Sequence, residues 1–178
     1  MIIHINGWPG VGKLTVARVL SQTLGARLLD NHTLHDVPGR LCQRNTPEYW
    51  RLYYQVRTVA YDCVRAMPTD QVLVMTNALL TESEREREAW EAVKQLAASR
   101  SDTLVAITLE CTLDENTRRL RSDERRFRKL IDVEPLVEWR SKYTLLTDNT
   151  VPSHLVDNSV LSPEQAAAQI AAFVRELA

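Results

Sequence analysis

The first fifteen residues hold the pattern with the clearest chemistry. Residues 7–13 fit the phosphate-binding motif Gly-x-x-x-x-Gly-Lys. Gly10 and Gly12 can adopt backbone dihedrals closed to other residues, so successive N–H groups can point inward at phosphate oxygens while Lys13 neutralises the outer phosphates. A glycine-rich turn without a ligand would share these letters. The apolar run before the motif and the helical spacing of apolar residues after it favour a nucleoside triphosphate site.

The expected phosphate contacts come from the motif and the two residues that follow it. They are Gly7, Pro9, Gly10, Val11, Gly12, Lys13, Leu14 and Thr15. In the usual motif, a Ser or Thr directly after the lysine reaches Mg²⁺ through its hydroxyl. Leu14 occupies that position here and the hydroxyl follows one residue later. We therefore expect Thr15 to contact phosphate, and we keep it as a candidate metal residue.

A second polar group follows the apolar run 26–29. The carboxylate of Asp30, facing the γ-phosphate, can order the water shell of the metal or accept the proton of an attacking hydroxyl. His32 can hold the phosphoryl acceptor or take the proton itself, since its unperturbed pKa of about 6.5 lies near neutrality. Alternatively, Asp30 caps the next helix and His32 is solvated. We predict that Asp30 is catalytic and binds metal, and that His32 binds the acceptor.

Basic residues crowd into one stretch in the second half of the chain. They are Arg118, Arg119, Arg121, Arg125, Arg126, Arg128 and Lys129. Phosphoryl transfer spreads negative charge over the equatorial oxygens, and arginines on a closing segment stabilise that charge. This stretch falls between two expected helices, where kinases with a similar phosphate loop have a mobile lid. The resemblance implies that Arg125 is catalytic, that Arg121 binds the nucleotide and that Arg128 binds the acceptor. A solvated helix face is the alternative for several of them.

Composition fits one domain spanning the 178 residues. Hydrophobic residues make up 44% and charged residues 25%, with a net charge of −1, so we expect no nucleic-acid partner. We expect no membrane attachment, because no apolar run reaches the length of a membrane span and no signal peptide precedes the first strand. The three cysteines are widely spaced and fit no metal-ligand pattern. We therefore expect reduced thiols and a cytoplasmic location.

Alternating strand and helix patterns must position these groups. Apolar runs predict strands at 2–5, 26–29, 71–75, 103–109 and 154–156. Helices are expected at 14–23, 47–66, 81–98, 114–121, 133–146 and 163–177, with Ser83, Asp114 and Ser162 as caps. Residues 33–46 contain Pro38 and Gly39 and predict a helix start followed by a loop. The alternation predicts an α/β fold with about five parallel strands and helices on both faces.

Ligands of such sheets bind outside the carboxyl ends of the strands. This rule brings together residues 7–15, 30–32, 76–77 and 111–114, with the turn 158–163 close by.

The string Gly-x-Pro-Gly-x-Gly-Lys-x-Thr at residues 7–15 resembles the phosphate loop of adenylate kinases and related nucleoside monophosphate kinases. That family has Gly where Leu14 stands and holds its metal largely through water and carboxylates. Asp30 and His32 stand where shikimate kinase and related small-molecule kinases carry Asp-x-Asp. The first Asp of that motif lies near the metal and the second holds the substrate hydroxyl. The resemblance implies a P-loop NTPase three-layer sandwich with an Arg-rich lid at about 118–132.

Three further positions are interpreted through this resemblance. In shikimate-type kinases an arginine after an aromatic residue grips the substrate carboxylate, and Arg51 after Trp50 resembles that pair, with a solvated helix face as the alternative. Arg140 followed by Tyr143 resembles an adenylate kinase pattern loosely. The end of the third strand matches neither family and leaves Asn77 as a polar contact. We predict that Arg51, Asn77 and Arg140 bind the acceptor.

The resemblance implies an ATP-dependent phosphotransferase that uses Mg²⁺ and moves the γ-phosphoryl group to a small-molecule acceptor, through a hydroxyl as in shikimate kinase. A nucleoside monophosphate kinase is the alternative, which the phosphate loop favours and the third strand disfavours. A nucleotide-binding or hydrolysing switch without an acceptor is an alternative of another class. In nucleotide kinases of this fold, the turn equivalent to 158–163 packs against adenine.

Overall fold

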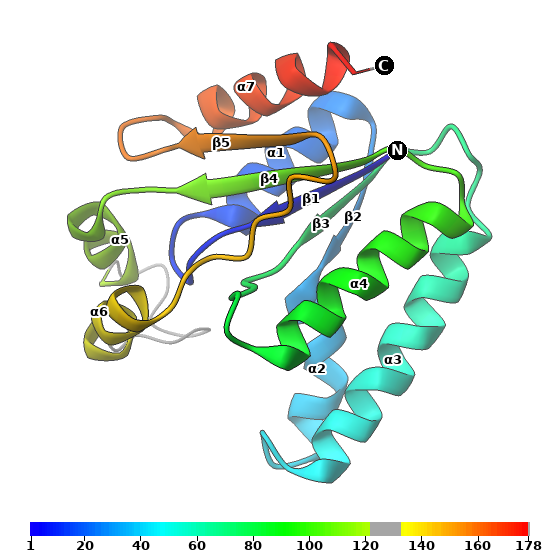
Figure 1. Cartoon of the computed structure of the whole chain (residues 1–178), viewed down its shortest axis with the longest axis horizontal. Helices are drawn as coiled ribbons and strands as arrows, with labels where there is room; N and C mark the ends of the chain where they lie inside the picture. Colours follow the sequence, from blue (N-terminus) through cyan, green and yellow to red (C-terminus); the bar gives the residue numbers. More distant parts are fainter. Residues whose placement is uncertain (122–132, 178) are drawn as a thin grey trace.

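A five-stranded parallel sheet forms the centre of the computed structural model, which describes residues 1–121 and 133–177. The strands are β1 (Ile2–Asn6), β2 (Arg27–Asp30), β3 (Leu73–Thr76), β4 (Leu104–Glu110) and β5 (Ser153–Asp157). Their order across the sheet is β2-β3-β1-β4-β5 (Figure 1). The predicted sheet is confirmed, with strand bounds shifted by one or two residues.

Helices cover both faces of this sheet (Figure 1). They are α1 (Lys13–Leu24), α2 (Asn31–Leu41), α3 (Pro47–Arg65), α4 (Glu84–Ser99), α5 (Leu113–Leu120), α6 (Val133–Lys142) and α7 (Pro163–Arg175). None of the helices in the described ranges is long and apolar enough to cross a membrane.

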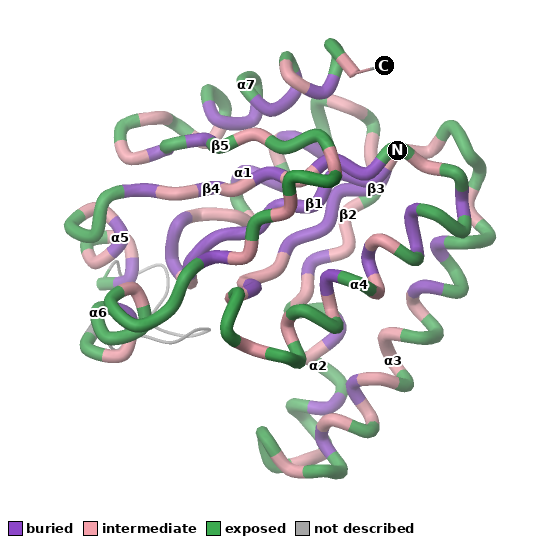
Figure 2. Tube along the Cα trace, viewed as in Figure 1, coloured by how far each residue is buried: buried purple, intermediate pink, exposed green. Residues whose placement is uncertain are grey.

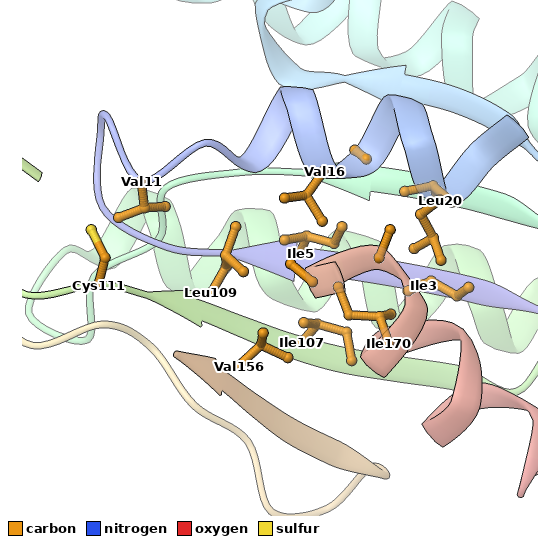
Figure 3. Close-up of a cluster of buried hydrophobic side chains, with 14 of the residues drawn as sticks. Ile3, Ile5, Val11, Val16, Leu20, Ile107, Leu109, Cys111, Val156 and Ile170 are labelled. Atoms are coloured by element: carbon orange, nitrogen blue, oxygen red, sulfur yellow. The ribbon is translucent and has the colours of Figure 1, made fainter. Parts of the chain in front are cut away.

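Side chains alternate between the two faces along β1, and each face has its own apolar core. Ile3 and Ile5 belong to the cluster that includes α1 and α7 residues (Figure 3). Ile2 belongs to the other cluster, with Tyr61 of α3 and Trp90 of α4. The central strands are therefore buried almost throughout (Figure 2), which confirms the three-layer arrangement.

The chain departs from the expected helix bounds in four places, and one of them is α4, which begins at Glu84 after its cap Ser83 and not at residue 81. α2 runs through Pro38 and Gly39, where we expected a loop. Proline removes one backbone hydrogen bond and usually breaks a helix, but Pro38 is buried and α2 packs along α3. This packing overrides the local preference.

The helix α5 begins one residue before the predicted cap. Thr112, not Asp114, is its N-cap, and the Thr112 hydroxyl accepts the backbone N–H of Glu115 at 3.3 Å. The predicted caps Ser83 and Ser162 are confirmed.

The helix α6 ends at Lys142, four residues before the predicted end. Leu145 instead pairs with Leu80 in an isolated antiparallel bridge, and the Asn6 amide donates to the carbonyl of Leu146 at 3.0 Å. These tertiary contacts hold the segment after α6 extended across the sheet.

Candidate nucleotide and acceptor site

The phosphate loop, residues 7–12, connects β1 to α1 at the carboxyl edge of the sheet. Its backbone needs glycine: Gly10 has a φ of 96° and Gly12 a φ of 98°. A Cβ at Gly7 would lie 2.3 Å from the carbonyl oxygen of Leu109. Within residues 1–121 and 133–177, no side chain caps the N-terminus of α1, so its first N–H groups face the loop without a side-chain acceptor from these residues. This is the arrangement that binds phosphate.

The carbonyl groups of this loop have partners elsewhere in the protein. Pro9 O accepts from the Asn116 side chain at 3.0 Å. Val11 O accepts from Arg119 at 2.7 Å and from the Asn158 amide at 2.9 Å. Because a peptide points its N–H opposite to its C=O, carbonyls held from outside leave the N–H groups facing the phosphate side. Side chains from α5 and from the turn after β5 thus shape the loop.

The residues after the loop differ in what they offer a nucleotide. The Lys13 ammonium donates to Gly7 O at 2.6 Å and to Trp8 O at 2.9 Å, which holds it over the loop. Leu14 is half-buried, whereas Thr15 is exposed and lines a cavity beside the loop. The shift of the hydroxyl by one residue therefore places it on a residue that lines this cavity.

The cavity has a volume of 530 Å³, within the usual range for small-molecule sites. Its walls are Gly12 and Thr15 on one side, the α5 residues Glu115 and Arg118, and the turn 158–163 on the other side. The expectation that this turn lies close to the phosphate loop is confirmed.

Glu115 fixes the positions of the two arginines that line the cavity, Arg118 and Arg119. It accepts from Arg118 at 2.6 and 2.7 Å and from Arg119 at 2.6 Å. These hydrogen bonds lower the pKa of Glu115 to about 2, so it is ionised at neutral pH. Arg119 also donates to the carbonyl of Asn158 at 2.7 Å, so it joins α5 to the loop and to the turn.

Asp30 lies at the carboxyl end of β2, where the strand register aligns it with Thr76 and Ile5 in one row across the sheet. Its carboxylate is buried and accepts from the Thr76 hydroxyl at 2.5 Å. Asp30 occupies the N-cap position of α2 but makes no side-chain capping bond. The His32 ring lies 3.4 Å from the carboxylate, with its side chain 57% exposed. The fold thus brings Asp30 and His32 together at the edge that holds the loop.

Helices α2 and α3 form an arm beyond β2 (Figure 1). The His35 ring stacks on Tyr53 with a centroid distance of 4.4 Å, and the Tyr53 hydroxyl donates to the Asn31 side chain at 3.3 Å. Burial is the main cause that lowers the pKa of His35 to about 4. Uncharged and aromatic side chains therefore join α2 to α3. One of them, Asn31, follows Asp30 directly in the sequence.

The other predicted acceptor residues lie in different surroundings. Asn77 faces His4, with 3.0 Å between Oδ1 and Nε2, and burial lowers the pKa of His4 to about 4, so the imidazole is neutral. Arg51 is exposed, on a different side of α3 from the buried Tyr49. Arg140 donates to protein acceptors behind the phosphate loop.

The predicted lid residues are only partly described. Arg121 is exposed at the C-terminus of α5. Arg125 and Arg128 lie outside the described residues.

Three side chains that shape the loop were not among the predicted site residues: Asn116, Arg119 and Asn158. The sequence held a signal for one of them. Asn116 precedes the buried Leu120 by one helical turn, so it shares the inner face of α5 and, as a buried amide, must find partners.

No three His, Cys, Asp or Glu side chains in residues 1–121 and 133–177 come together as a metal-binding group.

No protein-family model matches the chain, and no curated protein matches its sequence. Solved structures match over nearly its whole length. A kinase candidate from Chloroflexus aurantiacus J-10-fl has a TM-score of 0.69 at 18% identity, covering 98% of this chain and 96% of that one. A gluconokinase from Sinorhizobium meliloti 1021 has a TM-score of 0.63 at 15% identity, covering 99% and 92%. Shikimate kinase from Aquifex aeolicus VF5 has a TM-score of 0.58 at 19% identity, covering 99% and 98%. These likenesses confirm the predicted α/β fold with a five-stranded parallel sheet between layers of helices.

Proposed function

We propose that this chain is an ATP-dependent kinase that moves the γ-phosphoryl group to a hydroxyl of a small molecule. The observation that carries the proposal is the phosphate loop, whose Pro9 and Val11 carbonyls are held from outside and which borders a cavity of 530 Å³. Such a loop offers its N–H groups to phosphate without further rearrangement. The fold shared with gluconokinase and shikimate kinase supports the same activity.

ATP would lie with its phosphates along residues 7–13 and its nucleoside in the cavity. Lys13 would move from the loop carbonyls to the outer phosphates, and Thr15 would donate its hydroxyl to a phosphate oxygen. Arg118 and the turn 158–163 would enclose the base, with Arg121 beside the nucleotide.

Mg²⁺ would be held by oxygen donors, which suit this hard cation. Thr15 and Asp30 offer a hydroxyl and a carboxylate, whereas the alkyl side chain of Leu14 offers no donor. When bound, Mg²⁺ neutralises charge on the β- and γ-phosphates.

The acceptor would lie between Asp30 and the α2–α3 arm. Its hydroxyl oxygen attacks the γ-phosphorus, the bond from phosphorus to the ADP oxygen breaks, and the hydroxyl proton passes to the Asp30 carboxylate. The bond from Thr76 fixes the orientation of that carboxylate. His32 would hold the hydroxyl, with Asn77 as a further polar contact.

We also propose that residues 1–178 form one domain in which 118–132 acts as the lid. Arg125 would stabilise charge on the transferred phosphoryl group and Arg128 would contact the acceptor. The three free thiols support a cytoplasmic location.

The test is ADP release from Mg-ATP with sugars, shikimate-like acids, nucleosides and nucleoside monophosphates, with product identified by mass. We expect ADP release only with an acceptor, one phosphorylated product per ADP, loss of ATP binding in Lys13→Ala, and loss of transfer with retained ATP binding in Asp30→Asn. Transfer to nucleoside monophosphates alone would establish the alternative kinase class. Hydrolysis at full rate without any acceptor would establish a nucleotide switch instead.

A further inference from the structure

We infer that Arg140 is a positioning residue of the phosphate loop: through Asn116, it connects α6 to the Pro9 carbonyl and so sets the affinity for ATP. The inference rests on the proposed function, because the ligand of the loop is taken to be ATP. It replaces the expectation that Arg140 binds the acceptor.

Asn116 is the middle of this connection. It is 0% exposed, and its amide reaches the loop on one side and α6 on the other. Nδ2 donates to Pro9 O at 3.0 Å, and Oδ1 accepts from Arg140 Nη1 at 3.0 Å. Since a guanidinium can only donate, Arg140 fixes which end of the amide carries the oxygen. The NH₂ end is thereby directed at Pro9.

The guanidinium of Arg140 is itself held on three sides. Besides Asn116, its Nη2 donates to the carbonyl of Cys111 at 3.0 Å, at the start of α5. The guanidinium carbon lies 5.7 Å from the centroid of the Trp8 ring, within cation–π range. Arg140 therefore contacts the loop residue Trp8 directly and Pro9 through Asn116. Lysine cannot reproduce this planar, forked arrangement.

Close packing leaves this connection little freedom. A Cβ placed on Gly10 would lie 2.5 Å from Asn116 Nδ2, so the amide lies directly against the loop backbone. A shift of α6 that moves Arg140 must then move or release the amide that holds Pro9. The direction of the Gly10 N–H is set by the direction of the Pro9 carbonyl, because both belong to one planar peptide. ATP affinity depends in turn on how the loop N–H groups are directed.

The test measures binding of Mg-adenylyl imidodiphosphate by calorimetry without any acceptor. Asn116→Asp removes the donor to Pro9, and Arg140→Lys removes the fork. We expect each to weaken binding about tenfold, the loss that one hydrogen bond to a charged group represents. The double variant should bind the analogue no more weakly than the single variant with the lower affinity, because both substitutions break the same connection from Arg140 through Asn116 to Pro9.

Lys142→Gln is the matched control, because Lys142 is exposed on the same helix and pairs only with Glu138 among the described residues. Its affinity should equal that of the wild type. Unfolding midpoints are recorded for every variant, and Arg140→Gln replaces Arg140→Lys if the latter does not fold.

Two results would overturn the inference. One is unchanged analogue affinity together with a raised KM for the acceptor, which would make Arg140 an acceptor contact. The other is losses that add in the double variant, which would make the two residues independent. Failure of the proposed function has a different signature, since the wild type itself would then bind no analogue or transfer no phosphoryl group.

Discussion

Substituting Gly10 by alanine tests how closely α5 packs on the phosphate loop. Gly10 has a φ of 96°, and an added Cβ would lie 2.5 Å from Asn116 Nδ2 and 2.9 Å from Leu120 Cδ2. Both neighbours are buried, so neither can swing into solvent. The substitution therefore combines a backbone cost with a packing cost.

The two costs can be separated with other glycines of the chain. Left-handed backbone costs a non-glycine residue about 1–2 kcal/mol, and an overpacked methyl group costs about 1–3 kcal/mol more. Gly10→Ala should thus lower the free energy of unfolding by about 2–5 kcal/mol. Gly25 has a φ of 61° and nothing within 4 Å of its added Cβ, so Gly25→Ala should lose only the backbone part. Gly12→Ala should resemble Gly25→Ala, because its nearest neighbour lies at 3.6 Å.

Urea unfolding of the three variants, followed by far-UV circular dichroism, gives the comparison directly. Gly12→Ala adds a second measurement, since its Cβ would lie 3.6 Å from Arg119 Nη1 and 3.7 Å from Asn158 Nδ2 in the lining of the cavity, and should weaken ATP binding without the large loss of stability. If Gly10→Ala is no less stable than Gly25→Ala, α5 does not pack closely on the loop. Asn116 and Arg119 of α5 would then not hold the carbonyls of Pro9 and Val11 in place.

Two further predictions concern stability. Burial lowers the pKa of His4 from 6.5 to about 4, so the unfolded chain binds more protons than the folded protein between these pH values. The free energy of unfolding therefore falls as the pH is lowered from 6.5 to 4, and His4 contributes up to about 3 kcal/mol to this fall. Urea titrations across that range should show a shallower pH dependence in His4→Gln, and equal slopes would contradict the prediction. Arg100, with a side chain 2% exposed, bonds Asp102 at 2.6 Å and the carbonyls of Val64 and Pro68. Lysine keeps the charge but cannot reach all of these acceptors, so Arg100→Lys should destabilise the protein by about 1–3 kcal/mol. Thermal unfolding against the exposed control Arg65→Lys checks this, and equal melting temperatures would refute it.

Local patterns predicted the elements that depend on local forces. The strand before the loop, the turn glycines and the cap at Ser162 follow from short-range backbone and side-chain rules. The loop expected at Pro38 was wrong, because packing of α2 on α3 outweighs the cost of proline in a helix. The predicted end of α6 was wrong for a similar reason. The Asn6 side chain, on β1, donates a hydrogen bond to the carbonyl of Leu146, and this tertiary contact holds the residue outside the helix.

By itself, the sequence determined the phosphate loop, the alternation of strands and helices, and therefore the parallel sheet with polar residues at its carboxyl edge. Only the tertiary structure decided which side chains hold the loop open. The bond from Asn116 to Pro9 spans 107 residues and that from Asn158 to Val11 spans 147. Motif spacing cannot record such partners, because any buried carbonyl needs a donor but accepts it from whichever element packs there.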